Sequence, residues 1–172
     1  MEEMLEKLTK IQLSKLCRLY IYEQLSSIGD TDFEYKIIKT LEEWPDIKVF
    51  EYNLFKLNLI QIVEMYYVNS SILKFVNCSN KEFAYSRHHL GTQPFIDLTL
   101  TDKGREVIEK LSIEDRLNLI FYHYEYITDY FKLVQFLINK LPIASLPKYL
   151  VHKGLLVRCL ATERYDALSK NI

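Results

Sequence analysis

The sequence predicts a mainly helical fold with one small antiparallel β-hairpin, an α+β arrangement. Its 172 residues include only four glycines and four prolines, so long stretches lack the residues that interrupt helices. Apolar residues recur at helical spacing over much of the chain, whereas Phe95–Leu100 alternates apolar and polar residues as a strand does. With 49% apolar residues the chain can bury a sizeable core.

Two helices are expected at the start of the chain. Residues 8–26 carry apolar side chains on more than one face, which predicts a centrally buried helix. The run Thr31-Asp32-Phe33-Glu34 fits a capping box and starts a second helix. Pro45 ends that helix near Trp44, because a residue before proline is pushed out of the helical region.

A third helix is expected from about residue 48 to 64, after a turn at Pro45-Asp46. Two short helices joined by a tight turn form a helix-turn-helix, so this helix is the candidate for the DNA major groove. Asparagine bonds adenine edges, and lysine and tyrosine hold phosphates. The candidate DNA-binding residues on it are Lys48, Tyr52, Asn53 and Lys56. The alternative is that they form the solvated face of an amphipathic helix.

Three strands are expected next, at 72–76, 82–87 and 95–100. The last two would form a hairpin whose tip spans residues 87–94. The candidate contacts of this tip with a phosphate or a minor groove are Arg87, His88 and His89. The alternative is a solvated loop without a partner. Adjacent histidines point in different directions and no third ligand stands at suitable spacing, so neither a metal nor a cofactor is expected.

The run Leu100-Thr101-Asp102-Lys103-Gly104-Arg105 leads from the last strand directly into a helix, capped by Thr101 or Asp102. This junction resembles the end of the wing in winged helix-turn-helix proteins, especially the MarR-like and PadR-like regulators. In those proteins a Leu-Thr-x-x-Gly-Arg or a close variant closes the second wing strand. The Gly-poor composition, rich in Lys, Ile, Tyr and Asn, is also similar to that of small winged-helix proteins of archaeal viruses and plasmids. The resemblance implies a winged-helix fold and DNA binding.

One long helix is expected over residues 113–141, after a cap at Ser112. Its apolar residues recur at alternating spacings of four and three, the pattern of a coiled-coil seam. The candidate dimerisation residues are Leu117, Ile120, Tyr124, Ile127, Phe131 and Val134. Such a helix is longer than one small domain can cover. Its surplus surface is expected to meet a second subunit or, alternatively, to be covered by residues 143–172.

The domain division that follows is a winged helix-turn-helix domain at 1–111 and a helical, dimerising segment at 112–172. In the second segment a short helix is expected after Ser145-Leu146-Pro147, with Gly154 as its stop. A last amphipathic helix then follows from residue 155 to 168.

Several classes of protein are disfavoured. The sequence has no nucleophile elbow, phosphate-binding loop or zinc-protease motif, so an enzyme is not expected. Its three cysteines, Cys17, Cys78 and Cys159, form no Cys-x-x-Cys pair, which argues against a disulfide framework or a zinc ribbon. No membrane-spanning run and no secretion signal is seen, so a soluble, cytoplasmic protein is expected.

Two functions remain open. The first is a homodimeric, sequence-specific double-stranded DNA-binding protein that regulates transcription, with two-fold symmetry matching a palindromic site. The second is a winged-helix protein–protein interaction or assembly module without nucleic acid. The net charge of −1 and the thirteen tyrosines favour the second function. Salt-dependent binding to duplex DNA separates the two.

Overall fold

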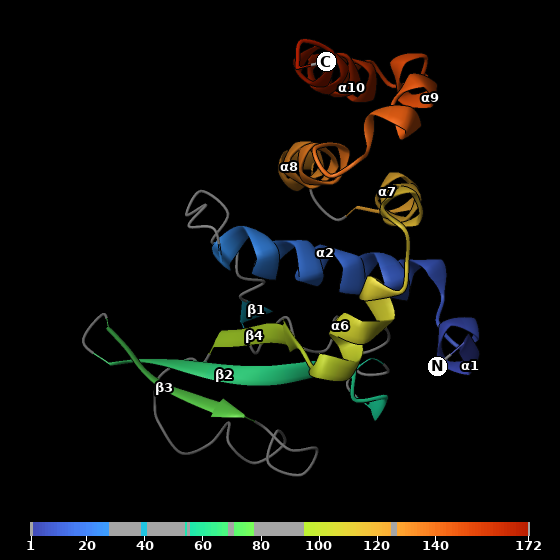
Figure 1. Cartoon of the computed structure of the whole chain (residues 1–172). Coiled ribbons are helices and arrows are strands. Elements are labelled where there is room, and N and C mark those ends of the chain that lie inside the picture. Colours follow the sequence, from blue (N-terminus) through green and yellow to red (C-terminus); the bar gives the residue numbers. More distant parts are fainter. Residues whose placement is uncertain are drawn as a thin grey trace. The chain divides into compact units, whose positions relative to one another are not determined.

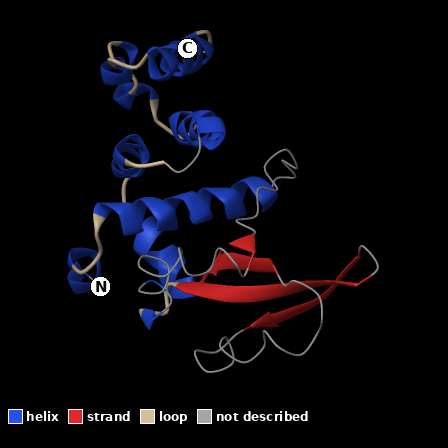
Figure 2. Ribbon diagram, turned by 180° about the vertical axis from the view of Figure 1, so that it is seen from behind, coloured by secondary structure: helices blue, strands red, loops and turns tan. Residues whose placement is uncertain are grey.

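The computed structural model describes residues 2–27, 39–40, 54, 56–68, 71–77, 95–124 and 127–171 (Figure 1). The described chain is mainly helical and contains one small antiparallel sheet (Figure 2). Contacts divide it into two units: unit 2 is Tyr22–Val107, and unit 1 combines Met1–Ile21 with Ile108–Ile172. This division differs from the predicted boundary at residue 111, because contacts group residues 1–21 with the C-terminal helices.

The sheet of unit 2 has four strands in the order β1-β4-β2-β3, and all neighbours are antiparallel. The strands are β1 (Lys39–Thr40), β2 (Ile60–Val68), β3 (Ser71–Asn77) and β4 (Phe95–Leu100). β2 and β3 form a hairpin, and β4 pairs with β2 from Ile60 opposite Leu100 to Met65 opposite Phe95. The predictions of strands at 72–76 and 95–100 are therefore confirmed.

The predicted second helix is wrong at Lys39 and Thr40. These two residues form β1 and pair with Ile96 and Phe95 of β4. Pairing with a strand far along the chain overrides the local apolar periodicity that predicted a helix there. The rest of the predicted turn and helix lies outside the described residues.

The predicted third helix is wrong beyond Leu57. Asn58 adopts a left-handed backbone conformation with φ of 58°. The Leu59 N–H then donates to the carbonyl oxygen of Leu54 at 2.9 Å, a closure typical of a helix C-terminus. Asparagine tolerates this conformation better than most residues. The following residues, Ile60–Val68, are rich in β-branched and aromatic side chains and form β2 instead of helix.

The predicted wing hairpin is not the hairpin that the structure describes. Residues 78–94, which include the predicted strand 82–87 and the tip 87–94, lie outside the described residues. Within the described part, the neighbours of β4 are β1 and β2. β4 is therefore held by pairing with strands that are distant in sequence, because β3 and the segment after it lie between β2 and β4 in the chain.

Unit 1 is built from helices around an apolar core. They are α1 (Glu2–Glu6), the first part of α2 (Lys10–Ser27), α7 (Ile113–Tyr122), α8 (Ile127–Ile138), η3 (Ile143–Ser145), α9 (Pro147–Leu150) and α10 (Leu155–Ser169). α6 (Asp102–Glu109) runs across the division between the units. Fully buried core residues include Leu16, Leu117, Leu133 and Leu146. No helix in the part of the chain that the structure describes is long and apolar enough to cross a membrane.

Helix ends in unit 1 follow the predicted caps in part. Ser112 caps α7, since its Oγ accepts from the Asp115 N–H at 3.0 Å. Pro147 stands in the first turn of α9, as predicted. Gly154 was predicted to stop this helix, but α9 ends at Leu150 and Gly154 precedes α10 as its N-cap.

The prediction of one long helix over 113–141 is wrong, because the segment forms two helices, α7 and α8. α7 ends where His123 turns to an extended conformation, with φ of −150° and ψ of 130°. The Ser14 Oγ donates to the His123 carbonyl oxygen at 2.6 Å. On α8, Asp129 forms a buried ion pair with Arg18 of α2. These contacts with α2, together with packing of α7 on α8, hold the broken arrangement.

Candidate nucleic-acid interface and the junction that positions it

The junction between β4 and α6 holds the C-terminal end of the helix to which Leu54 and Lys56 belong, where that helix gives way to a turn at Leu57. Thr101 Oγ1 accepts from the Gly104 N–H at 3.0 Å, which caps α6, and donates to the Asn58 carbonyl oxygen at 2.6 Å. The Thr101 N–H donates to the Leu59 carbonyl oxygen at 3.1 Å. These bonds satisfy backbone groups that the end of the one helix and the start of the other leave without intrahelical partners.

Lys103 adds a contact to the same helix end. Its Nζ donates to the Leu57 carbonyl oxygen at 3.1 Å, and the side chain is otherwise exposed. A cation is favourable there, because the C-terminal end of a helix carries partial negative charge.

Gly104 is required by close approach of the backbone. A Cβ atom at this position would lie 2.1 Å from the Leu59 carbonyl oxygen and 3.2 Å from Leu100 Cδ2. The first distance is far inside van der Waals contact with a backbone atom. The glycine therefore allows α6 to start directly against the segment between Asn58 and β2.

Arg105 connects the junction to α2. Its Nε lies 2.8 Å from Glu23 Oε2, and one NH2 group donates to the Leu100 carbonyl oxygen at 3.2 Å. Its other NH2 group lies 2.6 Å from Asp102 Oδ1. The hydrogen bond that Arg105 donates to the Glu23 carboxylate, together with the negative charges of Glu23 and Asp102, raises the pKa of Arg105. The residues that carry the winged-helix resemblance thus join α2, β4, α6 and the helix ending at Leu57 inside unit 2.

Only one of the predicted DNA-binding residues lies in the described part. Lys56 is exposed and is the last helical residue before the turn at Leu57. Lys103, which sequence reasoning did not select, reaches the end of the same helix through its bond to Leu57. The sequence contains a signal for Lys103, because this residue follows the Thr101 cap within the Leu-Thr-x-x-Gly-Arg motif. The other predicted residues, Lys48, Tyr52, Asn53, Arg87, His88 and His89, lie outside the described residues.

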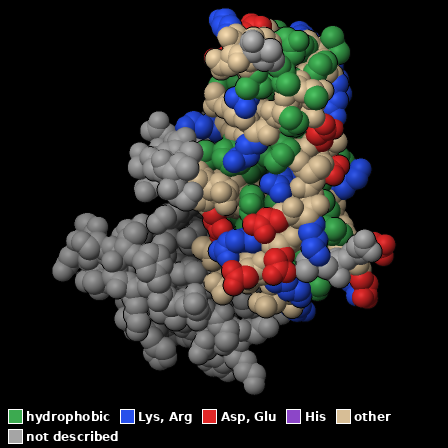
Figure 3. Space-filling view, viewed as in Figure 1, with side chains coloured by type: hydrophobic (Ala, Val, Ile, Leu, Met, Phe, Trp, Pro, Cys, Tyr) green, Lys and Arg blue, Asp and Glu red, His purple; other side chains and the backbone are tan. Residues whose placement is uncertain are grey.

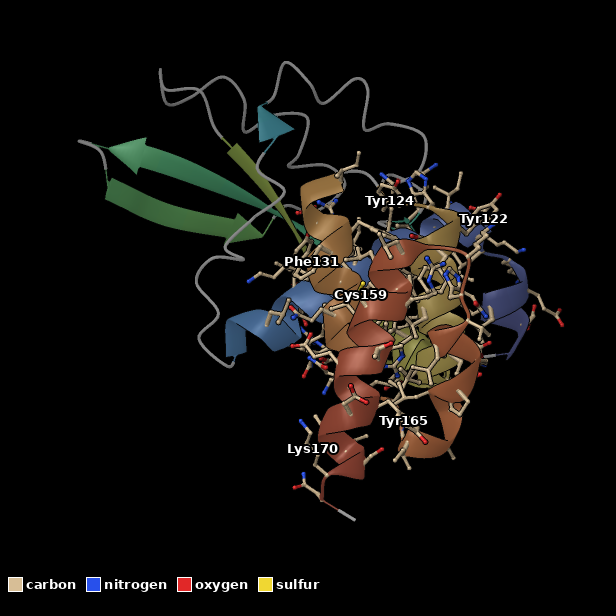
Figure 4. All side chains as sticks on the ribbon, turned by 90° about the horizontal axis from the view of Figure 1, so that it is seen from above. Tyr122, Tyr124, Phe131, Cys159, Tyr165 and Lys170 are labelled. Atoms are coloured by element: carbon tan, nitrogen blue, oxygen red, sulfur yellow. The ribbon has the colours of Figure 1, made fainter. Side chains whose placement is uncertain are left out.

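The predicted dimerisation seam is divided by the break between α7 and α8. Leu117, Ile120 and Val134 are fully buried in unit 1. In contrast, Ile127 is 79% exposed, and Tyr124 and Phe131 are 40% and 41% exposed. Figure 4 labels the side chains of Tyr124 and Phe131. The rings of Tyr124 and Tyr130 contact each other with centroids 4.5 Å apart. Leu117, Ile120 and Val134 therefore belong to the core of unit 1, whereas Tyr124, Ile127 and Phe131 are accessible in this chain.

The charge of unit 2 disfavours strong attraction to phosphate. Over Tyr22–Val107 the sequence has nine Lys and Arg against thirteen Asp and Glu, a net charge of −4. Unit 1 has thirteen against ten, a net charge of +3. Acidic and basic side chains are interspersed on the coloured surface of Figure 3. A DNA contact by unit 2 would have to rest on local cations such as Lys56 and Lys103.

Metal and thiol chemistry find little support in the residues that the structure describes. They contain no group of three His, Cys, Asp or Glu side chains that fits a metal ion. Cys17 is buried, and desolvation raises the pKa of its thiol to about 12, although the positive charge of Arg116 opposes the shift. Cys159 is exposed, and Cys78 lies outside the described residues.

Comparisons with known proteins return no relative. No protein-family model, no curated protein sequence and no solved structure matches the chain.

Proposed function

We propose that this protein binds double-stranded DNA through a winged helix-turn-helix and regulates transcription as a homodimer. One observation carries the proposal. Three residues of the Leu-Thr-x-x-Gly-Arg junction contact the C-terminal end of the helix at Leu57. Thr101 and Lys103 donate hydrogen bonds to the carbonyl oxygens of Asn58 and Leu57, and Gly104 allows close approach to the Leu59 backbone. A helix that reads a DNA groove needs such a rigid support, because its side chains must reach base edges in one register.

The mechanism places the helix ending at Leu57 in the major groove. Lys48, Tyr52 and Asn53 would contact base edges and phosphates, and Lys56 would hold a phosphate near the helix end. Lys103 would add a second phosphate contact beside Lys56. The segment before β4, with Arg87, His88 and His89, is the proposed wing. The exposed Tyr124, Ile127 and Phe131 would supply the contact between two subunits.

The experiment is a salt titration of binding to duplex DNA, followed by fluorescence anisotropy. Each lost phosphate contact lowers the slope of log affinity against log salt by about one. We expect this change for Lys56→Gln and again for Lys103→Gln. Lys7→Gln is the matched control, because Lys7 is exposed and, among the described residues, its ion pair is with Glu3 on α1. Wild-type protein that does not bind duplex DNA even at low salt would refute the proposal.

The second candidate is a protein–protein interaction or assembly module. The net charge of −4 on unit 2 favours it, since that charge repels phosphate. The exposed apolar side chains Tyr122, Ile127 and Val151 favour it as well. If the protein is such a module, the anisotropy of duplex DNA does not change on titration. Sedimentation then reports self-association or a complex with another protein.

A further inference from the structure

Unit 1 contains a groove along α2 and α7 with a volume of about 350 Å³. Leu13, Leu111 and Leu119 give it an apolar wall. Its polar groups are Lys10, Asp115 and Asn118, and the Tyr122 ring completes the lining. Small-molecule sites typically measure about 300–1,000 Å³ and combine apolar walls with a few polar groups, so this groove has the size and composition of a ligand site.

Lys10 places a positive charge at one end of the groove, and no described residue forms an ion pair with it. Lys10 is the first residue of α2, and the first turn of that helix holds no acidic residue. The N-terminal end of a helix is itself partly positive, so a lysine there is unfavourable unless an anion is near. In the residues that the structure describes, Lys10 forms no ion pair. Its Nζ lies 5.2 Å from the centroid of the Tyr122 ring.

Asp115 also lines the groove, about two helical turns before Tyr122 on α7, and its carboxylate is hydrogen-bonded. The Ser112 Oγ donates to Asp115 Oδ2 at 2.7 Å and accepts from the Asp115 N–H at 3.0 Å. This carboxylate would repel an anion, so a negatively charged group is stable only at the Lys10 end. Asn118 is exposed on the same helix and offers an amide donor and acceptor.

We propose that the groove binds a small anionic amphiphile, a molecule with one carboxylate or sulfonate head on an apolar chain or ring. The head pairs with the Lys10 ammonium, and the apolar part lies along Leu13 and Leu119 beside the Tyr122 ring. The groove thus offers one positive charge and an apolar wall to the same ligand. The proposal concerns unit 1 alone and does not depend on DNA binding.

The test uses decanoate as the probe, titrated calorimetrically below its micelle concentration. Decyltrimethylammonium, with the same chain and a positive head, is the comparator. Lys10→Met is expected to weaken decanoate binding about tenfold, because a hydrogen bond between charged groups is lost. Lys140→Met is the matched control: Lys140 is also exposed and also lies over a ring, with Nζ 4.7 Å from the Phe136 centroid, but does not line the groove.

Two further readouts locate the ligand. Decanoate should shift the methyl resonances of Leu13 and Leu119 and leave those of buried Leu146 unchanged. Asn118→Trp, a change at an exposed position, should obstruct the groove and lower affinity without unfolding the protein. The proposal is overturned if decyltrimethylammonium binds as tightly as decanoate. It is equally overturned if Lys140→Met loses as much affinity as Lys10→Met, or if the Leu13 and Leu119 methyls do not move.

Discussion

Thr101 Oγ1 donates a hydrogen bond of 2.6 Å to the carbonyl oxygen of Asn58, 43 residues earlier in the chain. The same oxygen accepts from the Gly104 N–H, so one hydroxyl bonds the backbone just after one helix and caps the start of α6. A side chain with this double role ties the position of the helix ending at Leu57 to the position of α6. The stability of unit 2 should therefore respond sharply to changes at the junction.

Replacing Thr101 by valine removes the hydroxyl while keeping the branched shape. Thr101→Val is expected to lower the free energy of unfolding by about 1–3 kcal/mol, through a lost N-cap and an unsatisfied Asn58 carbonyl. Thr101→Ser keeps the hydroxyl and should cost much less. Urea unfolding followed by circular dichroism measures both variants. Equal losses would mean that the methyl group, and not the hydroxyl, stabilises the junction.

Adding one methyl group at Gly104 tests the close approach to Leu59. Gly104→Ala places Cβ 2.1 Å from the Leu59 carbonyl oxygen, so the backbone must shift. We expect a loss of about 1–3 kcal/mol or more, as for overpacked cores. Gly154→Ala is the control, because its nearest neighbour would be His152 Nδ1 at 3.3 Å, on a side chain that can move. If both variants melt at the same temperature, Gly104 is not a contact point.

A charge placed on the two halves of the seam should separate packing from association. Ile120 is fully buried, so Ile120→Glu buries an unpaired carboxylate and should unfold unit 1. Ile127 is 79% exposed, so Ile127→Glu should change the free energy of unfolding by less than about 0.5 kcal/mol. Sedimentation equilibrium then reports whether the same change dissociates a homodimer. A monomeric wild-type protein at micromolar concentration would remove the homodimer from the proposed function.

Thiol labelling should distinguish the two described cysteines. In a Cys78→Ser background, Cys159 should react with Ellman's reagent at pH 8, whereas Cys17 should react only after unfolding. A pKa of about 12 leaves almost no thiolate on Cys17 at that pH, and the thiolate is the nucleophile.

The same shift has a linkage consequence with a defined sign. Because the folded-state pKa of Cys17 is raised, the folded protein holds this proton more tightly than the unfolded chain does. Its contribution to stability is complete below the ordinary pKa of 9.0 and declines as pH rises toward about 12. Cys17→Ala should flatten that part of the stability profile relative to Cys159→Ala. Rapid labelling of Cys17 in the folded protein would contradict its burial.

Elements with a strong local signal were predictable from the sequence. The alternation of Phe95–Leu100, the Ser112 cap and the amphipathic stretch that forms α10 are all confirmed. The junction from strand to helix was also predicted, because Thr101 and Gly104 belong to a short, specific motif. Its function in binding DNA stays a prediction.

The errors arose where distant contacts decide the local structure. β1 exists because it pairs with β4, and no local pattern at Lys39 announces that partner. The break after Tyr122 contains neither glycine nor proline, so no local signal in the sequence marks it. It is stabilised by contacts of Ser14 and Arg18 from the N-terminal part of the chain. At Asn58 a readable signal was missed, because asparagine is a residue type that accepts a left-handed helix end.

The discontinuity of unit 1 has a consequence for biosynthesis. The contacts of Ser14 with His123 and of Arg18 with Asp129 span 109 and 111 residues. At about 5–20 residues per second, a ribosome needs several seconds to tens of seconds to make the intervening chain. During that interval Leu16 and Cys17, both fully buried in the finished protein, have no core to enter. A chain truncated before residue 108 lacks α7 to α10 and should therefore aggregate through the apolar side chains that α2 exposes.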